Sequence, residues 1–289
     1  MKRVIITIIG SLVLLAGLSF VCYPFISNYL MEQNQSSEIL NQNLSVNQGE
    51  NKNIEKALIA AREYNKRLLS NVMLSDPFNY DSDKDYDKKY YELLNMNGNG
   101  VMGSIEIPKI NVKLPIYHGT STRTLEKGIG HLQKTSLPVG GKSTHAVLTG
   151  HSGLSTSRLF TDLEQLSVND IFFIYVLNQK LAYKVDSIKV VLPTEINELK
   201  VVNDKDYVTL VTCTPYGKNT HRLLVRGERT DYYKAKEIAD ETKPAETIWM
   251  MQYKKALMIG LAILLIIISV FFTFKFILKN RKSSIKNNG

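Results

Sequence analysis

Two long apolar runs lie near the ends of the 289-residue chain. The first, Val4 to Phe25, contains no charged residue, and the second, Ala256 to Leu278, is interrupted only by Lys275. About 20 apolar residues suffice for a helix to cross a bilayer, whereas the apolar part of a cleaved signal peptide has roughly 7–15. We therefore expect residues 1–27 to form an uncleaved signal anchor and residues 256–278 a second transmembrane helix. A cleaved signal is the alternative for the first run.

Basic residues flank both runs on their outer ends. Lys2 and Arg3 precede the first run, no Lys or Arg occurs from position 28 to 51, and a basic tail at 279–289 follows the second run. Because basic residues favour the cytoplasmic side, we expect both termini in the cytoplasm and the middle of the chain outside the plasma membrane. The net charge is +9, but without the end segments 29 basic residues face 27 acidic ones. The high pI therefore reflects membrane topology, and we expect no nucleic acid as a partner.

The composition changes several times along the chain between the two apolar runs. Residues 28–53 are rich in Asn, Gln and Ser and predict a flexible spacer, and apolar residues at helical spacing predict an amphipathic helix at 53–70. We expect 28–100 to form a segment outside the membrane that contains the spacer and this helix. We expect residues 101–230 to form a separate domain and the polar stretch 231–255 to connect it to the second run.

Within 101–230, short apolar runs alternate with turns containing Gly, Pro or Asn. Short strands at this spacing are typical of a β-barrel or a β-sandwich. One short helix is expected at 159–166. The expected strands begin around 105 and 112 and then cover 145–149, 171–177, 181–192, 207–213 and 223–227.

The chain has two cysteines, and only one of them lies outside the expected spans. Cys22 falls in the first apolar run, so Cys213 has no partner for an intramolecular disulfide. Chance burial, intermolecular pairing and chemistry are the three explanations for such a thiol. The pattern after Cys213 predicts a long-loop hairpin that can bring Arg222 close to it. A guanidinium there could favour the thiolate or hold an oxyanion.

A cysteine nucleophile also needs a proton carrier, usually a histidine. His151 stands between two glycines where a strand ends, a setting that suits a functional side chain. For any single histidine a surface or core role is the more common outcome. The other candidates are His118, His131, His145 and His221. Without C-x-x-C or H-x-x-x-H spacing, a zinc site is disfavoured and no cofactor is expected.

The segments T-L-V-T-C at 209–213, Arg222 downstream and T-G-H at 149–151 resemble the sortases, cysteine transpeptidases of the Gram-positive cell surface. The longer stretches TLVTCTPYGKNTHRLLVRGER, GSIEIPKINVKLPIYHGT and LTGHSGLS are similar to the class C, pilin-polymerising branch. A second membrane span and a lid motif fit the same branch. The resemblance covers nearly the whole chain.

The resemblance implies a mainly β fold, an eight-stranded sortase-type β-barrel with short helices. It implies that Cys213 is the nucleophile, that His151 is the general acid and base, and that Arg222 positions the substrate and supports the oxyanion. The reaction would cut an LPxTG-like sorting signal between Thr and Gly through a thioacyl intermediate. The implied partners are pilin subunits with such a signal, the acceptor lysine of another pilin, and the membrane.

The segment Asp76-Pro77-Phe78 resembles the lid of that branch. In a lid, Asp76 would lie near the thiol or the imidazole, and Phe78 would cover the pocket. The ordinary alternative is a helix start in which Ser75 or Asp76 is the cap and Pro77 takes the first position, and the two can hold together.

Three other functions remain open. A sortase that anchors proteins to peptidoglycan would share Cys213, His151 and Arg222. A wall-anchored adhesin should carry its own LPxTG motif before its last apolar run, but residues 242–250 contain none. A barrel that binds sorting signals without cutting them is the third.

Overall fold

The computed structural model describes residues 2–68, 76–78, 87–154, 156–195 and 197–287. The chain divides into two units, Met1–Ala245 and Glu246–Gly289. The first unit contains the strands and all but one of the described helices. The second contains the helix α6, Ile248–Asn287.

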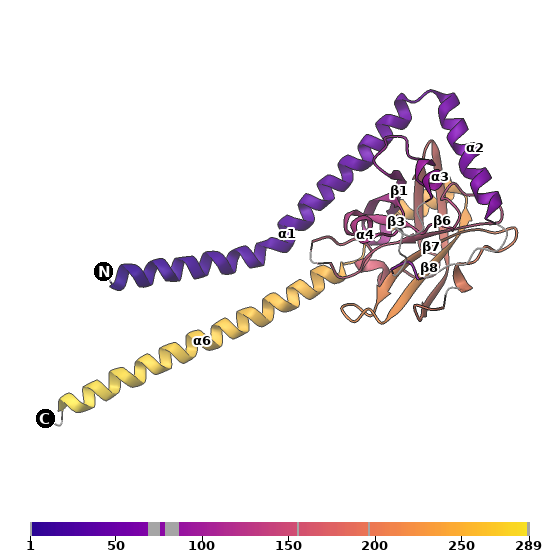
Figure 1. Cartoon of the computed structure of the whole chain (residues 1–289). Coiled ribbons are helices and arrows are strands. Elements are labelled where there is room, and N and C mark those ends of the chain that lie inside the picture. Colours follow the sequence, from indigo (N-terminus) through magenta and orange to yellow (C-terminus); the bar gives the residue numbers. More distant parts are fainter. Residues whose placement is uncertain (1, 69–75, 79–86, 155, 196, 288–289) are drawn as a thin grey trace. The chain divides into compact units, whose positions relative to one another are not determined.

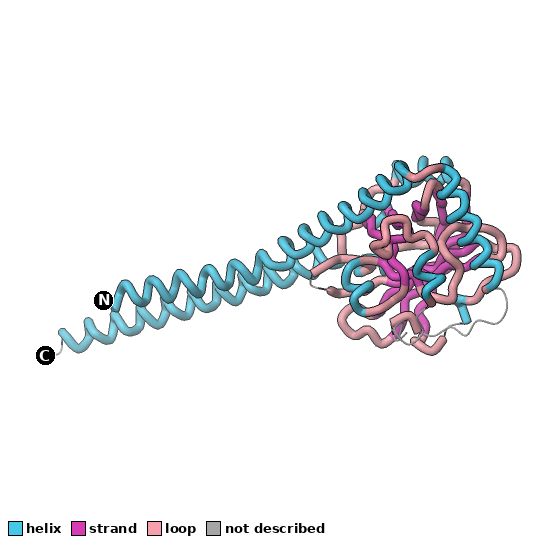
Figure 2. Tube along the Cα trace, turned by 45° about the horizontal axis from the view of Figure 1, so that its top comes forward, coloured by secondary structure: helices cyan, strands magenta, loops and turns pink. Residues whose placement is uncertain are grey.

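Eight strands close into one barrel in the order β1-β2-β3-β4-β7-β8-β6-β5, which confirms the predicted fold (Figures 1 and 2). Most neighbours are antiparallel, but β2 with β3 and β4 with β7 are parallel. In this closed order, β1 lies four strands from β7 in either direction. The strands are β1 Val101–Ile107, β2 Val112–His118, β3 Ile129–His131, β4 Thr144–Thr149, β5 Ile171–Val176, β6 Gln179–Val191, β7 Asp206–Thr214 and β8 His221–Thr230.

The barrel interior is filled by aliphatic and aromatic side chains from every part of the sheet. Ile105, Ile116, Phe172, Leu210 and Val225 are all fully buried in one cluster. Closure leaves no sheet edge, so backbone pairing continues around the barrel and fixes the register of each strand against two neighbours.

The polar stretch after residue 27 is helical, which corrects the expected flexible spacer. Helix α1 runs from Lys2 to Gln48 without a break, and α2 covers Asn51–Arg67. The second half of α1 contacts β1 and β2 and buries Ile39 and Val46. Tertiary packing of this kind outweighs the weak helix propensity of Asn and Ser.

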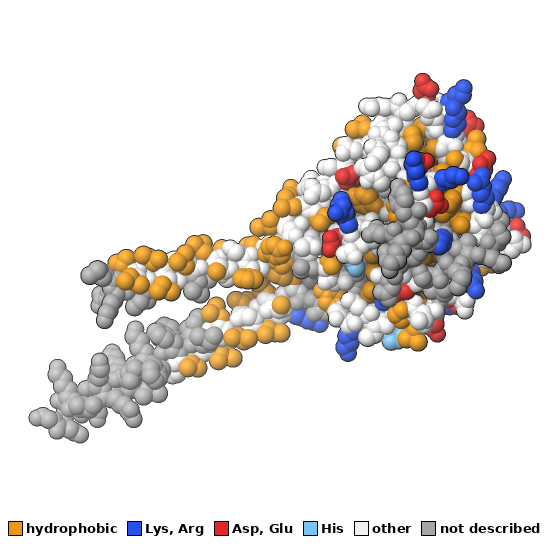
Figure 3. Space-filling model, in the orientation of Figure 1, with side chains coloured by type: hydrophobic (Ala, Val, Ile, Leu, Met, Phe, Trp, Pro, Cys, Tyr) orange, Lys and Arg blue, Asp and Glu red, His pale blue; other side chains and the backbone are white. Residues whose placement is uncertain are grey.

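The first half of α1 is exposed and apolar (Figure 3). Ile5, Leu12 and Leu18 each expose more than half of their surface. Among the described residues, one helix is long and apolar enough to cross a membrane. It covers Ile8–Gln48, and an 18-residue window within it has a mean hydropathy of 2.1. The expected second span falls in α6, where side chains from residue 274 onward lie outside the described residues.

Short helices complete the first unit. The helix expected at 159–166 is a single turn of 3₁₀ helix at Thr161–Gln165, labelled η2. Part of the polar connector forms a helix, α5. The others are α3 Lys88–Glu92, η1 Pro108–Ile110, α4 Thr122–Lys127, η3 Asn197–Leu199 and α5 Tyr232–Glu241.

Candidate active site

Cys213 and Arg222 lie directly opposite each other on adjacent antiparallel strands. The β7–β8 ladder pairs Cys213 with Arg222, one residue from the loop that joins the strands. Opposed residues in an antiparallel pair have Cβ atoms about 5 Å apart, so backbone pairing alone brings the guanidinium beside the sulfur. Both side chains are buried, each with 8 % of its residue surface exposed. The hairpin expected from the sequence is therefore present.

His151 reaches the same end of the barrel from β4. The parallel pairing of β4 with β7 matches Thr149 to Val211, and two further residues along both chains bring His151 level with Cys213. Two hydrogen bonds carry the pairing past the end of β4. The Gly150 N–H donates to the Val211 carbonyl at 3.1 Å, and the Thr212 hydroxyl donates to the Gly150 carbonyl at 2.7 Å. The histidine is thus tied to β7 by backbone geometry.

Asp76 lies on Arg222 as a bidentate ion pair. The Arg222 Nε and Nη2 atoms donate to the two Asp76 carboxylate oxygens at 2.9 and 2.6 Å, and both side chains are less than 10 % exposed. The Phe78 ring lies between the functional groups, with its centroid 4.9 Å from the Arg222 guanidinium carbon and 5.5 Å from the His151 ring centroid. Pro77 lies in the turn between Asp76 and Phe78. Ser75, the alternative helix cap, lies outside the described residues.

The geometry refines the expected position of Asp76. The sequence suggested the thiol or the imidazole as its neighbour, whereas its hydrogen bonds go to the guanidinium. Phe78 also packs on a small apolar cluster of the barrel wall that includes Val147 and Val211. The segment 76–78 therefore covers the region between Cys213, His151 and Arg222 in this structure.

Burial disfavours charge on both groups that would exchange a proton. It raises the pKa of the Cys213 thiol, an effect opposed by Arg222 and reinforced by Asp76. It lowers the pKa of the His151 imidazole, an effect opposed by the Glu126 carboxylate. With 76–78 in place, a neutral thiol and a neutral imidazole are therefore the main forms near pH 7.

Three of the other four histidines are buried, and their ring nitrogens make hydrogen bonds within the fold. The His131 ring contacts the Tyr90 hydroxyl at 2.9 Å and the Ser136 carbonyl at 2.9 Å. His145 contacts the Lys200 carbonyl and the Thr209 hydroxyl at 2.8 and 2.7 Å.

His118 and His221 complete the set. The two ring nitrogens of His118 lie 2.9 and 2.7 Å from backbone carbonyl oxygens. His221 pairs with Thr214 on β7 and neighbours Arg222. Within the described ranges, no group of three or more His, Cys, Asp or Glu side chains is arranged to hold a metal ion.

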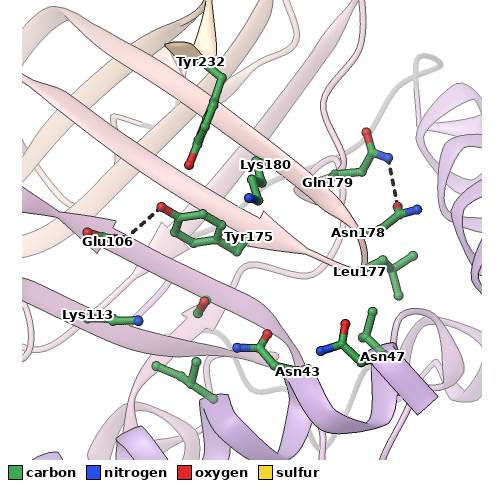
Figure 4. Close-up of a pocket in the computed structure, with 13 residues that line it drawn as sticks. Asn43, Asn47, Glu106, Lys113, Tyr175, Leu177, Asn178, Gln179, Lys180 and Tyr232 are labelled. Carbon is green, nitrogen blue, oxygen red and sulfur yellow. Dashed lines mark hydrogen bonds between the residues drawn. The ribbon is translucent and has the colours of Figure 1, made fainter. Parts of the chain in front are cut away.

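A cavity of about 560 Å³ lies on the far wall of the barrel and is separate from this site. It is formed by α1, β1, β5, β6 and α5, and within it the Tyr175 hydroxyl donates to Glu106 at 2.9 Å (Figure 4). Since β1 is the strand opposite β7 in the closed order, this cavity cannot hold a substrate at Cys213.

Sequence reasoning missed two acidic neighbours of the site. Glu126 on α4 is close enough to affect His151, and Glu164 on η2 accepts a 2.5 Å hydrogen bond from the Thr214 hydroxyl next to Cys213. Neither residue belongs to a motif, and both reach the site only through the fold.

The arrangement suits acyl transfer through sulfur. A thiol, an imidazole and a guanidinium meet where three neighbouring strands or their loops end, which provides a nucleophile, a proton carrier and a fixed positive charge. Arg222 keeps its charge at any physiological pH. Burial is the largest single effect and lowers its pKa, but the hydrogen bond and charge of Asp76 together with the nearby Cys213 more than offset burial, so the net shift of the Arg222 pKa is upward.

Comparison with known proteins gives a consistent result. The model of the sortase domain matches residues 105–230. Sortase A of Bacillus anthracis is 25 % identical over 78 % of this chain and 95 % of its own length. Sortase C of Clostridium perfringens is 46 % identical, with 68 % of this chain and 99 % of that chain covered and a TM-score of 0.58. Sortase C of Streptococcus pneumoniae is 40 % identical, with 68 % of this chain and 97 % of that chain covered and a TM-score of 0.61. The chain therefore belongs to the sortase family of cysteine transpeptidases, and its similarity to solved sortase C structures places it in the class C branch.

Proposed function

We propose that this sortase cleaves an LPxTG-like sorting signal between Thr and Gly and joins the new acyl group to a lysine of a pilin subunit. The observation that carries the proposal is the cross-strand pair of Cys213 and Arg222 with His151 level beside it. Two relatives support the substrate class. The Streptococcus pneumoniae enzyme is described for its pilin substrate specificity, and the Clostridium perfringens enzyme for a C-terminal cell-wall sorting motif.

In the first half of the reaction, the His151 imidazole takes the proton of the Cys213 thiol as the sulfur attacks the carbonyl carbon of the signal's threonine. The carbonyl oxygen becomes an oxyanion, which the Arg222 guanidinium stabilises. When the carbon–nitrogen bond to glycine breaks, protonated His151 gives its proton to the leaving amine. A thioester between Cys213 and the substrate remains.

In the second half, a neutral lysine amine attacks the thioester carbonyl. His151 takes the proton lost by the amine, the carbon–sulfur bond breaks, and the Cys213 thiolate leaves. The product is an isopeptide bond, and the Cys213 thiolate takes the proton back from His151, which restores the neutral thiol and the neutral imidazole of the starting state. Amine rather than water completes the cycle, so limited water access to the thioester favours polymerisation over hydrolysis.

In the resting enzyme, we propose that segment 76–78 acts as a closed lid. Asp76 accepts from Nε and Nη2 of the guanidinium, donors that a substrate carbonyl or an oxyanion would need, and Phe78 lies against the proton carrier. Substrate entry therefore requires this segment to leave.

The proposed enzyme sits in the plasma membrane with its barrel outside the cell. The apolar first half of α1 serves as the anchor, and the basic residues at both ends of the chain support two spans with cytoplasmic termini. An anchor next to the catalytic unit keeps the enzyme close to substrates that are themselves held in the bilayer.

The test compares two cysteine substitutions in a host that makes the pilin and no other sortase. Cys213→Ala should abolish the high-molecular-weight pilin ladder on a denaturing gel, and pilin monomer should accumulate. Cys22→Ala removes the thiol of the anchor and should leave the ladder intact. A ladder that persists in Cys213→Ala cells rejects the proposal. A Cys213-dependent product that contains a cell-wall amine instead of a pilin lysine identifies peptidoglycan anchoring as the function.

A further inference from the structure

The described residues of the loop that carries His151 make contacts on four sides. At its base, the Phe160 N–H donates to the His151 carbonyl at 3.0 Å. On the side of β7, the ring of Tyr216 lies so close to Gly153 that an added Cβ would stand 3.4 Å from it. At the end of the loop, the half-buried Arg158 forms an ion pair with the buried Asp162 at 2.9 Å. The fourth side is formed by α1.

Helix α1 contacts this loop through polar side chains near the end of the expected membrane anchor. The Asn28 side-chain oxygen accepts from the Arg158 N–H at 3.2 Å, and the Ser27 hydroxyl donates to the Thr156 carbonyl at 3.5 Å. Asn28 is itself oriented by a 2.9 Å hydrogen bond to Glu32, one helical turn further on. We call Ser27, Asn28 and Gln35 the α1 clasp.

Gln35 is the buried member of the clasp and contacts two elements at once. Its Nε2 atom donates to the Lys127 carbonyl at the end of α4, at 2.9 Å, and lies 3.5 Å from the Ser157 hydroxyl in the His151 loop. Gln35 and Ser157 are only 3 and 4 % exposed. A buried amide is costly when unpaired, so this side chain favours a single arrangement of helix, loop and α4.

Both elements that meet at Gln35 affect the imidazole. The loop carries His151 itself, and α4 carries Glu126, the carboxylate that opposes the burial effect on the His151 pKa. A cavity of about 200 Å³ lies between α1 and the loop, and its lining includes Asn28, Gln35 and Ser157. Apolar packing is therefore incomplete here and cannot substitute for these hydrogen bonds. The position of the loop against α1 therefore depends on a few hydrogen bonds.

We propose that the α1 clasp positions His151 for proton transfer, so that the anchor helix belongs to the catalytic framework as well as to the membrane attachment. This inference rests on the proposed transpeptidase function. Gln35 and Asn28 are positioning residues, because they act through the loop and touch neither substrate nor sulfur. Misplacement of a reacting group by about 1 Å can cost about 100-fold in rate, so loosening one side of the loop should lower kcat by about tenfold and leave KM within a factor of two.

The experiment uses the full chain in detergent micelles and compares Gln35→Met with Gln33→Met. Gln33 is exposed on the same helix, two residues away, so the same substitution there controls for effects on α1 itself. Three quantities are measured: kcat and KM for joining a sorting-signal peptide to a lysine peptide, the rate at which a methanethiosulfonate labels Cys213, and the thermal unfolding midpoint.

We expect Gln35→Met to lower kcat by about tenfold while the labelling rate of Cys213 stays within a factor of two, since β7 is untouched. Gln33→Met should match the wild type in all measurements. If Gln35→Met unfolds, Asn28→Ala, which removes the acceptor of the Arg158 N–H and the exposed hydrogen bond to Glu32, carries the same prediction for kcat. Wild-type kcat in the folded variants overturns the inference and leaves the proposed function standing. A wild-type enzyme that joins no peptides overturns the proposed function itself.

Discussion

Removal of the Asp76 carboxylate should open the site and speed the reaction of Cys213 with a thiol reagent. In Asp76→Ala, the two charge-assisted hydrogen bonds that hold the lid on Arg222, at 2.9 and 2.6 Å, are lost. Each hydrogen bond to a charged group is worth about 1.5–3 kcal/mol. Once the lid opens, water solvates the freed guanidinium, so we take the lower value, about 3 kcal/mol for the pair. This corresponds to an increase of about 100-fold in the open population.

The assay follows the labelling of Cys213 by a methanethiosulfonate in a Cys22→Ala background, so that only one thiol reacts. The matched control is Asp186→Ala. Asp186 holds Arg226 on the neighbouring stretch of β6 and β8 by the same bidentate geometry, with distances of 3.1 and 2.7 Å. Breaking that pair should leave the labelling rate within a factor of two.

Phe78→Ala should also speed labelling, by a smaller factor. It removes the ring that covers the guanidinium at 4.9 Å, a contact worth about 1 kcal/mol, and so should give about a fivefold increase. The lid assignment fails if Asp76→Ala labels at the wild-type rate, or if Asp186→Ala accelerates labelling equally. The second result would attribute the effect to general loosening of the barrel.

Three further outcomes follow from burial in and around the site. Because burial and Asp76 both raise the pKa of Cys213, the labelling rate should keep rising above pH 9, and in Asp76→Ala the midpoint of that rise should shift to lower pH. Gly150→Ala puts a Cβ 2.9 Å from Phe160 and should lower the unfolding free energy by about 1–3 kcal/mol, as measured in urea, together with transpeptidation. Burial lowers the pKa of His145 to about 4, while the unfolded chain takes up a proton near 6.5. Protonation of His145 should therefore contribute a loss of about 2 kcal/mol of stability between pH 7 and 5, and this contribution should disappear in His145→Gln, as followed by circular dichroism.

Much of the barrel could be predicted because its strands are long enough to show a pattern. β7 and β8 were recognised from their apolar runs and from the turn residues between them. β3 was missed because Ile129–His131 has only three residues, too few for any periodicity to appear. The helical course of α1 beyond residue 27 was also missed, because Asn, Gln and Ser predict little by themselves. The packing of Ile39 and Val46 on the barrel stabilises this helix. That packing depends on the strands that α1 contacts, so the sequence of α1 alone does not reveal it.

The candidate site shows the same division between local and distant information. The sequence marked Cys213, His151, Arg222 and the 76–78 motif, since each lies in a recognisable stretch. It could not say that Asp76 pairs with the guanidinium, because 146 positions separate the two residues. The contact of Gln35 with the loop after His151 spans a similar distance in sequence. Which side chains meet across such distances is set by barrel closure, and no short motif encodes it.

If α1 is the proposed anchor, its uninterrupted course would set the distance between the catalytic site and the bilayer. Ser27, the last residue of the proposed anchor, contacts Thr156 in the histidine loop, so the chemistry would take place within a few helical turns of the lipid headgroups. A continuous helix rises only 1.5 Å per residue, so it holds the barrel at a short and fixed distance. A flexible linker would allow a wide range of distances. A substrate that is still anchored in the bilayer by its own C-terminal tail could therefore reach the Cys213 sulfur with a cleavage site only a short distance above the membrane, without first leaving the bilayer.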